Sequence, residues 1–207
     1  MSTQSDHLNQ KIMTGLENMI PDKGTRQILF NALDVFAKKG LAGTKIKDIA
    51  QKAGFSQGFV YNYFKSKDEI FVKIADLAAE GAAAMVKNAS ELEGTPYQKI
   101  YWLVEALLDP DSVTLHHWRL IMLQASTSEA VPEEAKRISA DKMKIPIQYL
   151  IPVIEAGQAA GEIVAENPLA LAIAFFSIIQ GLGITRMQGG KEMPFPSVDL
   201  ILRFLKP

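Results

Sequence analysis

Apolar residues recur along the chain at spacings of three and four, and almost no segment alternates as a half-buried β-strand would. This periodicity predicts a protein built of α-helices. The first stripe predicts a short leading helix that ends at the turn-forming residues 21–24, and its inward positions are Leu8, Ile12, Leu16 and Met19.

Three further helices are expected before residue 70. The first follows Thr25, a residue type that caps helix N-termini, and stops at Lys38–Gly40, where lysines precede a glycine. The second follows Thr44, which can cap it, and ends at Gly54, because glycine adopts the left-handed conformation that terminates helices. The third follows Ser56, whose hydroxyl can accept a hydrogen bond from a backbone amide two or three residues later.

A helix, a glycine turn and a second short helix, packed on a preceding helix, form the helix–turn–helix of DNA-binding proteins. In the short third helix, Val60 and Phe64 lie four residues apart and are expected to face the core with Phe55 or Phe59. Polar and aromatic residues remain on the outside, where they suit base edges and phosphates. These outward residues are Gln57, Gly58, Tyr61, Asn62, Tyr63 and Lys65.

Charge is distributed unevenly, although the formal net charge is only −1. Residues 1–90 hold 12 lysines and arginines against 9 acidic residues, whereas residues 91–207 hold 10 against 14. This asymmetry predicts that only the first part contacts a polyanion. There is no cysteine, which excludes disulfides and thiolate chemistry, and the first residues lack the pattern of a secretory signal, so we expect a cytoplasmic protein.

Residues Gly54–Gly58 match Gly-x-Ser-x-Gly, the nucleophile elbow of serine hydrolases. Such an elbow joins a β-strand to a helix, whereas the apolar residues before Gly54 have helical spacing. A hydrolase also needs an acid and a histidine, and the later histidines, His116 and His117, have no recognisable partner. We therefore predict no catalytic residues, and a serine hydrolase using Ser56 is kept only as an alternative.

Two other classes of site are also set aside. Residues 168–185 approach the length of a membrane span, but Ser177 and Gln180 interrupt them and no basic cluster flanks them, so we expect a helix buried in a core or an interface and no membrane partner. His116 and His117 point about 100° apart on a helix, so they cannot easily hold one ion. No metal and no cofactor is expected.

Residues 40–71, GLAGTKIKDIAQKAGFSQGFVYNYFKSKDEIF, closely resemble the amino-terminal region of TetR-family transcriptional repressors. The resemblance spans about fifty residues, from Thr25 to Leu77. In many members histidine occupies the position of Tyr63. The matching positions are Thr44, Ile49, Ala50, Ala53, Gly54, Ser56, Gly58, Tyr61, Tyr63, Phe64 and Lys67.

The resemblance implies an all-α protein with an extension helix (residues 1–22), a three-helix DNA-binding domain (23–70) and, joined by a long fourth helix, a helical ligand-binding and dimerisation domain (71–207). The residues implied to contact phosphates are Thr44, Tyr61, Tyr63 and Lys67. Those implied to approach base edges are Lys47, Gln57, Gly58 and Asn62. Lys45, Ser56 and Lys65 complete the predicted DNA-binding set. Lys67 begins the fourth helix, capped by Ser66, where the helix dipole also attracts a phosphate.

The family's last two helices form a dimer interface, and the corresponding segments here are Pro168–Met187 and Pro196–Pro207. The stripe in the second segment could instead pack within the monomer; its members are Val198, Ile201, Leu202 and Leu205. Between the domains, Pro146 and Pro152 are expected to kink a helix and leave a cavity. The candidates for its wall, which could equally be simple core, are Trp102, Trp118, Met122, Tyr149 and Phe176.

These features predict a repressor that binds a palindromic operator as a dimer and is released by a small-molecule effector. A DNA-binding regulator that needs no ligand remains the main alternative. The sequence leaves open whether the leading helix contacts DNA.

Overall fold

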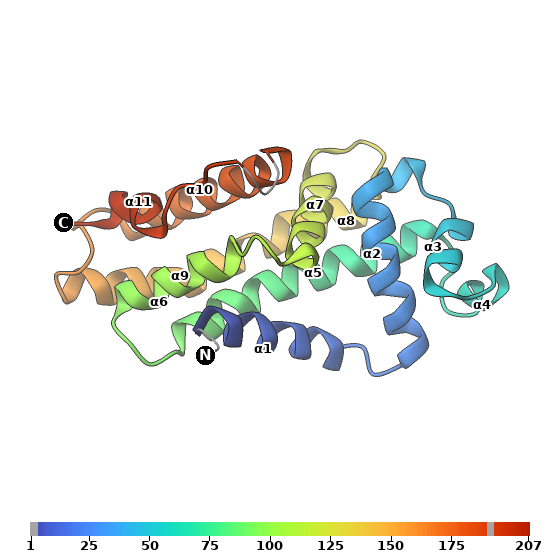
Figure 1. The fold of residues 1–207 in the computed structure, drawn as a ribbon, viewed down its shortest axis with the longest axis horizontal. Helices are drawn as coiled ribbons and strands as arrows, with labels where there is room; N and C mark the ends of the chain where they lie inside the picture. The colour runs from blue at the N-terminus through green and yellow to red at the C-terminus, as the bar shows by residue number, and fades with distance from the viewer. Residues whose placement is uncertain (1–3, 190–192) are drawn as a thin grey trace. The chain divides into compact units, whose positions relative to one another are not determined.

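A computed structural model describes residues 4–189 and 193–207, and it contains no β-strand among them. The all-α prediction is therefore confirmed. The helices, labelled in Figure 1, are α1 (Gln4–Asn18), α2 (Lys23–Gly43), α3 (Ile46–Ala53), α4 (Gln57–Tyr61), α5 (Lys67–Ser90), α6 (Pro96–Leu107), α7 (Val113–Thr127), α8 (Glu133–Lys142), α9 (Lys144–Ala159), α10 (Pro168–Gly189), α11 (Val198–Ile201) and the 3₁₀ helix η1 (Leu202–Leu205).

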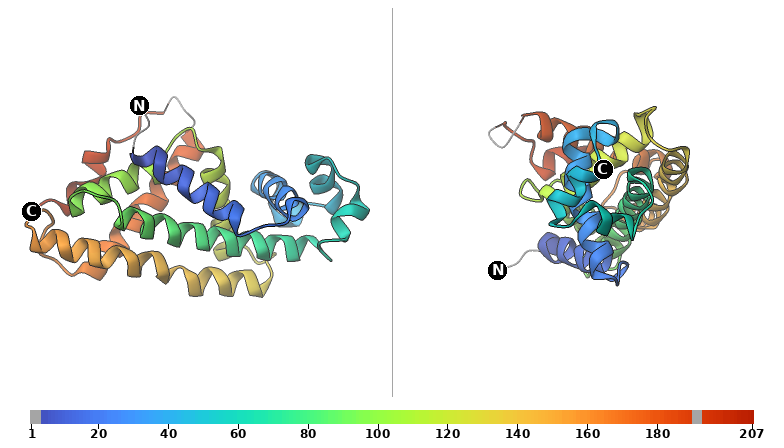
Figure 2. Two further views of the ribbon diagram at one scale, coloured as in Figure 1. Left: turned by 90° about the horizontal axis from the view of Figure 1, so that it is seen from below. Right: turned by 90° about the vertical axis from the view of Figure 1, so that its right-hand side faces the viewer.

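The chain forms two compact units. Unit 1 comprises the chain up to Ile12, Ala82–Val113 and Lys144–Pro207, and unit 2 comprises Met13–Gly81 and Thr114–Met143. In unit 2, α3 lies beside α2, and α4 lies beside α3, to which a short turn joins it (Figures 1 and 2). The functional division predicted at residues 22 and 70 is a separate question and stays a prediction.

The leading helix α1 buries Leu8, Ile12 and Leu16, as its apolar stripe predicts. The prediction for Met19 was wrong, because this side chain is 50% exposed and Ile20 is buried instead. The helix ends at Asn18, so helical spacing does not determine whether the residues after it face the core or the solvent.

Helix α2 begins earlier than predicted. Its N-cap is Asp22, whose carboxylate accepts a hydrogen bond from the Thr25 amide at 2.6 Å, so Thr25 lies inside the first turn and is not the cap. The backbone leaves the helical conformation at Gly40, with φ 69° and ψ 167°, and Gly43 ends the helix. The glycine stop expected at residue 40 is therefore a kink with a short helical continuation.

The turn between α3 and α4 agrees closely with the sequence. Gly54 is left-handed, with φ 73°, and its amide bonds to carbonyls of α3. The Ser56 hydroxyl accepts a hydrogen bond from the Phe59 amide at 3.1 Å, which confirms the predicted cap of α4. Val60 is fully buried and Phe64 is 7% exposed, so these two residues, four positions apart, anchor α4 on the core.

In the second half of the chain, the helix break falls before Pro146 and not at it. Proline 146 would clash with the carbonyl of Lys142, four residues earlier, and it offers that carbonyl no N–H. Helix α8 ends at Lys142, and α9 starts at Lys144 and continues through Pro152 to Ala159. The expected kink at Pro146 is thus a one-residue interruption at Met143, whose own backbone angles, φ −58° and ψ −24°, stay helical.

Candidate nucleic-acid interface

Helix α4 presents a polar and aromatic face to solvent. Gln57, Gly58 and Asn62 are exposed. Tyr61 is 53% exposed and Tyr63 is 38% exposed. Because Val60 and Phe64 are buried on the opposite side, the helix cannot rotate without losing core contacts. The outward set predicted for α4 is therefore displayed on one anchored surface.

Aromatic rings brace this face from one end to the other. Phe55 and Phe59 lie with ring centroids 4.2 Å apart, and Phe59 and Tyr63 lie 5.1 Å apart. Tyr63 also approaches the start of α2 so closely that a Cβ on Gly24 would come within 2.6 Å of its hydroxyl oxygen. Only glycine at position 24 leaves room for the Tyr63 ring. In the sequence, Gly24 was recognised only as part of a turn.

Thr44 takes a different place from the one expected. It is 1% exposed, and its hydroxyl donates a hydrogen bond to the Gly40 carbonyl at 2.7 Å, so it closes the end of α2. The residue at the N-cap of α3 is Lys45, and the prediction that Thr44 caps this helix was wrong. The Thr44 hydroxyl faces the protein interior because the kink at Gly40 leaves a carbonyl there without a helical partner.

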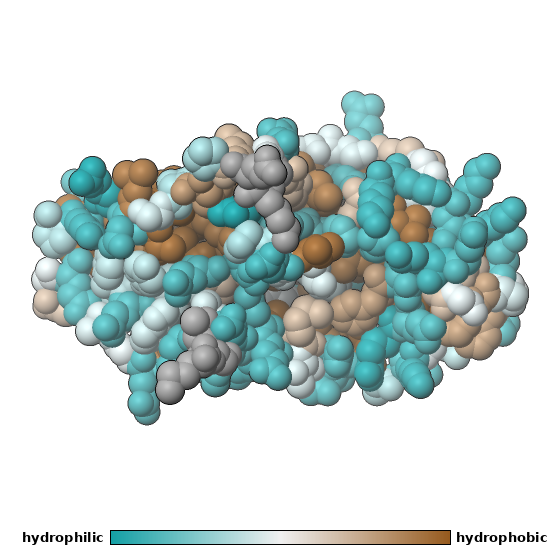
Figure 3. Space-filling view, viewed as in Figure 1, coloured by the Kyte–Doolittle hydropathy of each residue, from teal (hydrophilic) through white to brown (hydrophobic). Residues whose placement is uncertain are grey.

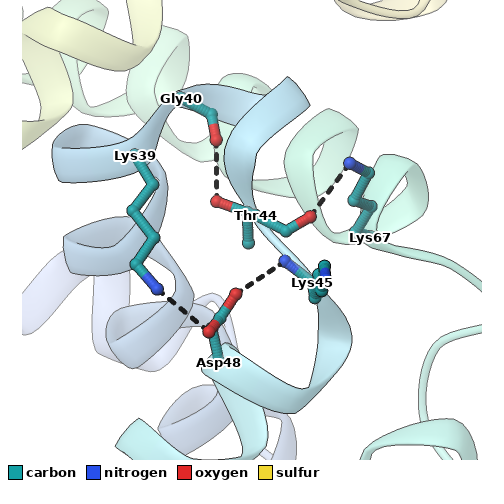
Figure 4. A network of polar contacts seen from close by, with 6 residues as sticks. All are labelled: Lys39, Gly40, Thr44, Lys45, Asp48 and Lys67. Carbon is teal, nitrogen blue, oxygen red and sulfur yellow. Dashed lines mark hydrogen bonds and ion pairs between the residues drawn. The ribbon is translucent and has the colours of Figure 1, made fainter.

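The Lys67 side chain also turns toward α2. Its ammonium donates to the carbonyls of Leu41, Ala42 and Thr44 at 2.8, 3.3 and 2.9 Å. Figure 4 shows Lys67 reaching from α5 to the segment that carries Thr44 and Lys45. As predicted, Ser66 caps α5, through a hydrogen bond from the Glu69 amide at 3.1 Å.

Three predicted cationic contacts, Lys45, Lys47 and Lys65, are exposed. The Lys45 amide donates to the Asp48 carboxylate at 2.9 Å, and the Lys39 ammonium lies 2.9 Å from the same carboxylate. These hydrogen bonds, the one from Lys39 first, hold the pKa of Asp48 below its usual value. Asp48 therefore stays ionised and fixes the first turn of α3, from which Lys45 and Lys47 project.

A cavity of about 440 Å³ lies between α2 and α3 in unit 2, and its walls are Asp34, Val35, Lys38, Lys39, Asp48, Gln51 and Lys52. Asp34 is its most connected carboxylate, because Lys38, Lys52 and His117 lie 2.8, 3.2 and 3.7 Å from it. Burial lowers the pKa of His117, and the attraction of Asp34 opposes this only in part. No group of three potential metal ligands forms among the described residues, so the histidine pair has no metal-binding cluster there.

The five predicted effector-wall residues fall into both units. In unit 2, Trp118 is 8% exposed and packs edge-on against Phe30, with Met122 half-buried nearby in sequence. In unit 1, the ring of Trp102 lies against Gly94, Phe176 packs edge-on against Phe175, and Tyr149 is 37% exposed. None of the five lines the cavity between α2 and α3 or the unit 1 cavity described next.

Unit 1 contains a cavity of about 310 Å³. Its walls come from α1, α6, residues 108–110, α10 and residues 195–201, and they include Asp6, Asn9, Glu105, Asp109, Arg186 and Phe195. Burial, and then the charge of Asp6, raises the pKa of Glu105. Sequence reasoning did not find this cavity, since its walls come from both ends of the chain and carry no spacing signal.

The last helices differ in how far they are covered. Only 28% of the most apolar 18-residue stretch of α10 is buried. Leu169 and Ile173 on this helix are each 49% exposed. In contrast, Ile201, Leu202 and Leu205 are buried inside unit 1, so most of the C-terminal stripe packs within the monomer. Figure 3 shows hydrophobic side chains gathered over α10 and α11. The α10 helix is therefore not buried in the core of the single chain, and its burial in an interface stays a prediction.

By length and composition α10 could cross a membrane, but the same properties fit a helix face that another protein covers. Its exposed apolar residues recur at helical spacing, as Leu169 and Ile173 do. Gln180, on the same open side, is also exposed.

Residues 28–74 match the family model described as "Bacterial regulatory proteins, tetR family". Over 159 residues the chain is 25% identical to the uncharacterized HTH-type transcriptional regulator YfiR of Bacillus subtilis, covering 75% of each chain. It is 29% identical over 159 residues to the HTH-type transcriptional repressor NicS of Pseudomonas putida, covering 72% of this chain and 69% of NicS.

Solved structures share the fold. A putative transcriptional regulator from Saccharomonospora viridis, in complex with choline, aligns with TM-score 0.72 and 24% identity over 86% of this chain and 91% of that one. The SmeT–triclosan complex aligns with TM-score 0.71 and 17% identity over 90% and 93% of the two chains. At these identities the likeness establishes the arrangement of helices.

Proposed function

The chain belongs to the TetR family of bacterial transcriptional regulators, and on this premise we propose that it represses transcription by binding a palindromic operator as a homodimer and leaves the operator when a small molecule binds. The relatives are regulators and not enzymes, so Ser56 serves as a helix cap and not as a nucleophile. Because operator DNA lies in the bacterial cytoplasm, the protein acts there.

The observation that carries the proposal is the exposed face of α4. Gln57 and Asn62 are amides of the kind that bond adenine edges, Gly58 allows close approach, and the hydroxyls of Tyr61 and Tyr63 suit phosphates. Lys45, Lys47 and Lys65 supply positive charge around it. A five-residue helix reads few base pairs, so specificity requires a second copy at a fixed spacing.

The open face of α10 supports the homodimer. An apolar helix face carrying Leu169 and Ile173 is self-complementary when two copies pack across a twofold axis. Since most of the C-terminal stripe packs inside unit 1, α10 supplies most of the apolar contact of the proposed dimer, and Leu200 of α11 is a further exposed apolar residue.

An effector is supported by the relatives and by the cavity of unit 1. Structural neighbours are described in complex with choline and with triclosan, two unlike small molecules. The cavity of about 310 Å³ falls at the lower end of the usual range for ligand sites, roughly 300–1,000 Å³. Trp102, Trp118, Met122, Tyr149 and Phe176 remain candidates for contacts after a rearrangement.

The decisive experiment is selection of genomic fragments by the purified protein, followed by affinity measurements on the selected sequence at two salt concentrations. The Gln57→Ala and Tyr61→Ala variants should each bind the operator more weakly, by roughly 5- to 150-fold for Gln57, because a bidentate base contact contributes about 1–3 kcal/mol. Gln51→Ala, an exposed amide on α3, is the matched control.

Equal retention of all fragments, with Gln57→Ala unchanged, would contradict sequence-selective binding. A ligand screen on the selected operator then separates a ligand-released repressor from a ligand-independent regulator. In the second case small molecules would bind the protein without changing its operator affinity.

A further inference from the structure

The cavity of unit 1 holds charges of opposite sign that do not neutralise each other. Arg186 of α10 and Glu105 of α6 both line it, and both are half-buried. No ion pair or hydrogen bond joins either side chain to another residue in the described part of the chain. Charges that lose hydration are normally paired or hydrogen-bonded, because the loss is otherwise unfavourable. A ligand that carries the complementary charges would supply the missing partners.

Arg186 lies against an aromatic ring and not against an anion. The carbon at the centre of its guanidinium is 3.6 Å from the centroid of the Phe195 ring, which also lines the cavity. Its buried Nε–H has no hydrogen-bond partner within residues 4–189 and 193–207. A cation–π contact attracts the charge but gives the N–H groups no lone-pair acceptor. A carboxylate gives two acceptors in a geometry that matches the guanidinium.

Other walls of the cavity present acceptors that lack donors. Burial, and then the charge of Asp6, raises the pKa of Glu105, and both influences disfavour the ionised carboxylate. The side-chain oxygen of Asn9 is buried and accepts no hydrogen bond from the described residues, although its amide nitrogen donates to Asp109 at 3.4 Å. An ammonium group has three protons and could donate to the Glu105 carboxylate and the Asn9 oxygen together.

We propose that the cavity of unit 1 binds a small zwitterionic amino acid, with its carboxylate on Arg186 and its ammonium group on Glu105 and Asn9. This inference rests on the proposed function, because it gives the chemical class of the effector. Leu108 and Ile201 add apolar surface for the ligand's carbon chain. An amine leaves Arg186 without an acceptor, and a carboxylic acid leaves Glu105 and Asn9 without a donor, so neither satisfies the cavity as a zwitterion does.

The proposal also gives the leading helix a role. Asn9 belongs to α1, and this helix precedes residues 28–74, which match the family model. Leu8 and Ile12 are buried on the same helix and fix the orientation of Asn9. Helix α1 is thus a wall of the effector site, which is an alternative to contact with DNA.

Isothermal titration calorimetry on the free, full-length protein tests the ligand class with two matched sets of probes. One set is L-leucine, isopentylamine and 4-methylpentanoate, and the other is 5-aminopentanoate, pentylamine and pentanoate. In each set the second compound lacks the carboxylate and the third lacks the amino group. At least one zwitterion should bind roughly tenfold more tightly than both of its analogues, the factor expected for a lost hydrogen bond between charged groups. Equal or weaker binding of both zwitterions would overturn the proposal.

Two variants assign the two ends of the ligand. Arg186→Gln should reduce the affinity for the zwitterion to that for the amine without weakening the amine itself. Glu105→Gln should reduce it to the affinity for the acid without weakening the acid. The matched controls, Arg203→Gln and Glu155→Gln, change exposed residues of unit 1 outside the cavity and should bind as the wild type does. Equal losses for all three probes of a set would show a general structural effect and would contradict the assignment.

Operator titration in the presence and absence of the zwitterion separates this inference from the proposed function. Binding of the zwitterion together with release of the operator supports both. If the zwitterion binds and operator affinity stays the same, the ligand class of the cavity is supported and the ligand-released repressor is contradicted. If other small molecules release the operator while neither zwitterion binds, the repressor is supported and this assignment of the cavity is wrong.

Discussion

Helices α4 and α10 both expose a face, but they are built in opposite ways. The exposed face of α4 is polar and aromatic, and the helix is held by Gly54, the Ser56 cap and buried Val60. The exposed face of α10 is apolar, on a helix of 22 residues. Water solvates the polar face of α4 well, so this face suits a transient partner such as DNA. Exposure of the apolar face of α10 to water is unfavourable in free energy, so this face suits a permanent protein contact.

The largest expected effect concerns α10. Ile173→Asp places a charge in the proposed interface, and an unpaired buried charge costs about 3–5 kcal/mol, so the dimer should dissociate at least 100-fold more readily. Analytical ultracentrifugation measures this directly. Val113→Asp, at an apolar residue that is 61% exposed outside the proposed interface, is the control. A dimer that survives Ile173→Asp unchanged would remove α10 from the interface.

The next effect concerns the turn before α4. Gly54→Ala forces a side chain into a left-handed conformation, which costs roughly 1–2 kcal/mol, and no neighbouring atom lies within 4 Å of the added Cβ to complicate the result. Thermal or urea unfolding should show this loss. Gly58→Ala, within α4 and with only a 3.9 Å contact, should not destabilise the fold. Equal stability of the two variants would contradict the strain at Gly54.

Loss of the α4 cap should have a slightly smaller effect. Ser56→Ala removes the acceptor of the Phe59 amide and should cost about 1 kcal/mol, while Ser56→Asp should keep the fold because aspartate also caps helices. The aspartate variant should nevertheless bind operator less tightly, since it adds a negative charge beside the proposed phosphates. Chemical unfolding and operator titration together separate the two roles.

The smallest effect is a pH dependence of stability from His117. Burial lowers its pKa in the folded protein, so below the ordinary value near 6.5 the unfolded chain binds the proton more readily. Stability from this group is therefore complete above that pH and declines as the pH falls below it, by less than about 1 kcal/mol. The decline between pH 7.5 and 5.5 should be shallower in His117→Gln; an identical decline would exclude His117 as its source.

The features of α4 that depend on residues close by in the sequence were predictable. Gly54, Ser56, Val60 and Phe64 act within a few residues of one another, so turn chemistry and helical spacing specify them. The family resemblance supplied the class of protein. It did not distinguish residues that face the solvent from those that face the protein.

The features that sequence reasoning did not find depend on tertiary contacts. The acceptors of Lys67 lie 23 to 26 residues before it, and Asp34 lies far along the chain from His117. No periodicity encodes such distances. The apolar stripe near the C-terminus fitted both packing within the monomer and a dimer contact. The observed burial of Leu202 and Leu205 shows that this part of the stripe packs within the monomer.

The separation of roles within α4 has an evolutionary consequence. Stability of the helix depends on Val60, Phe64 and the Ser56 cap, whereas Gln57, Tyr61 and Asn62 have no share in the core. If the outward residues read DNA as proposed, mutations there change operator preference with little effect on the stability of the fold. A gene duplicate of this regulator could acquire a new target by a few substitutions on one exposed helical face.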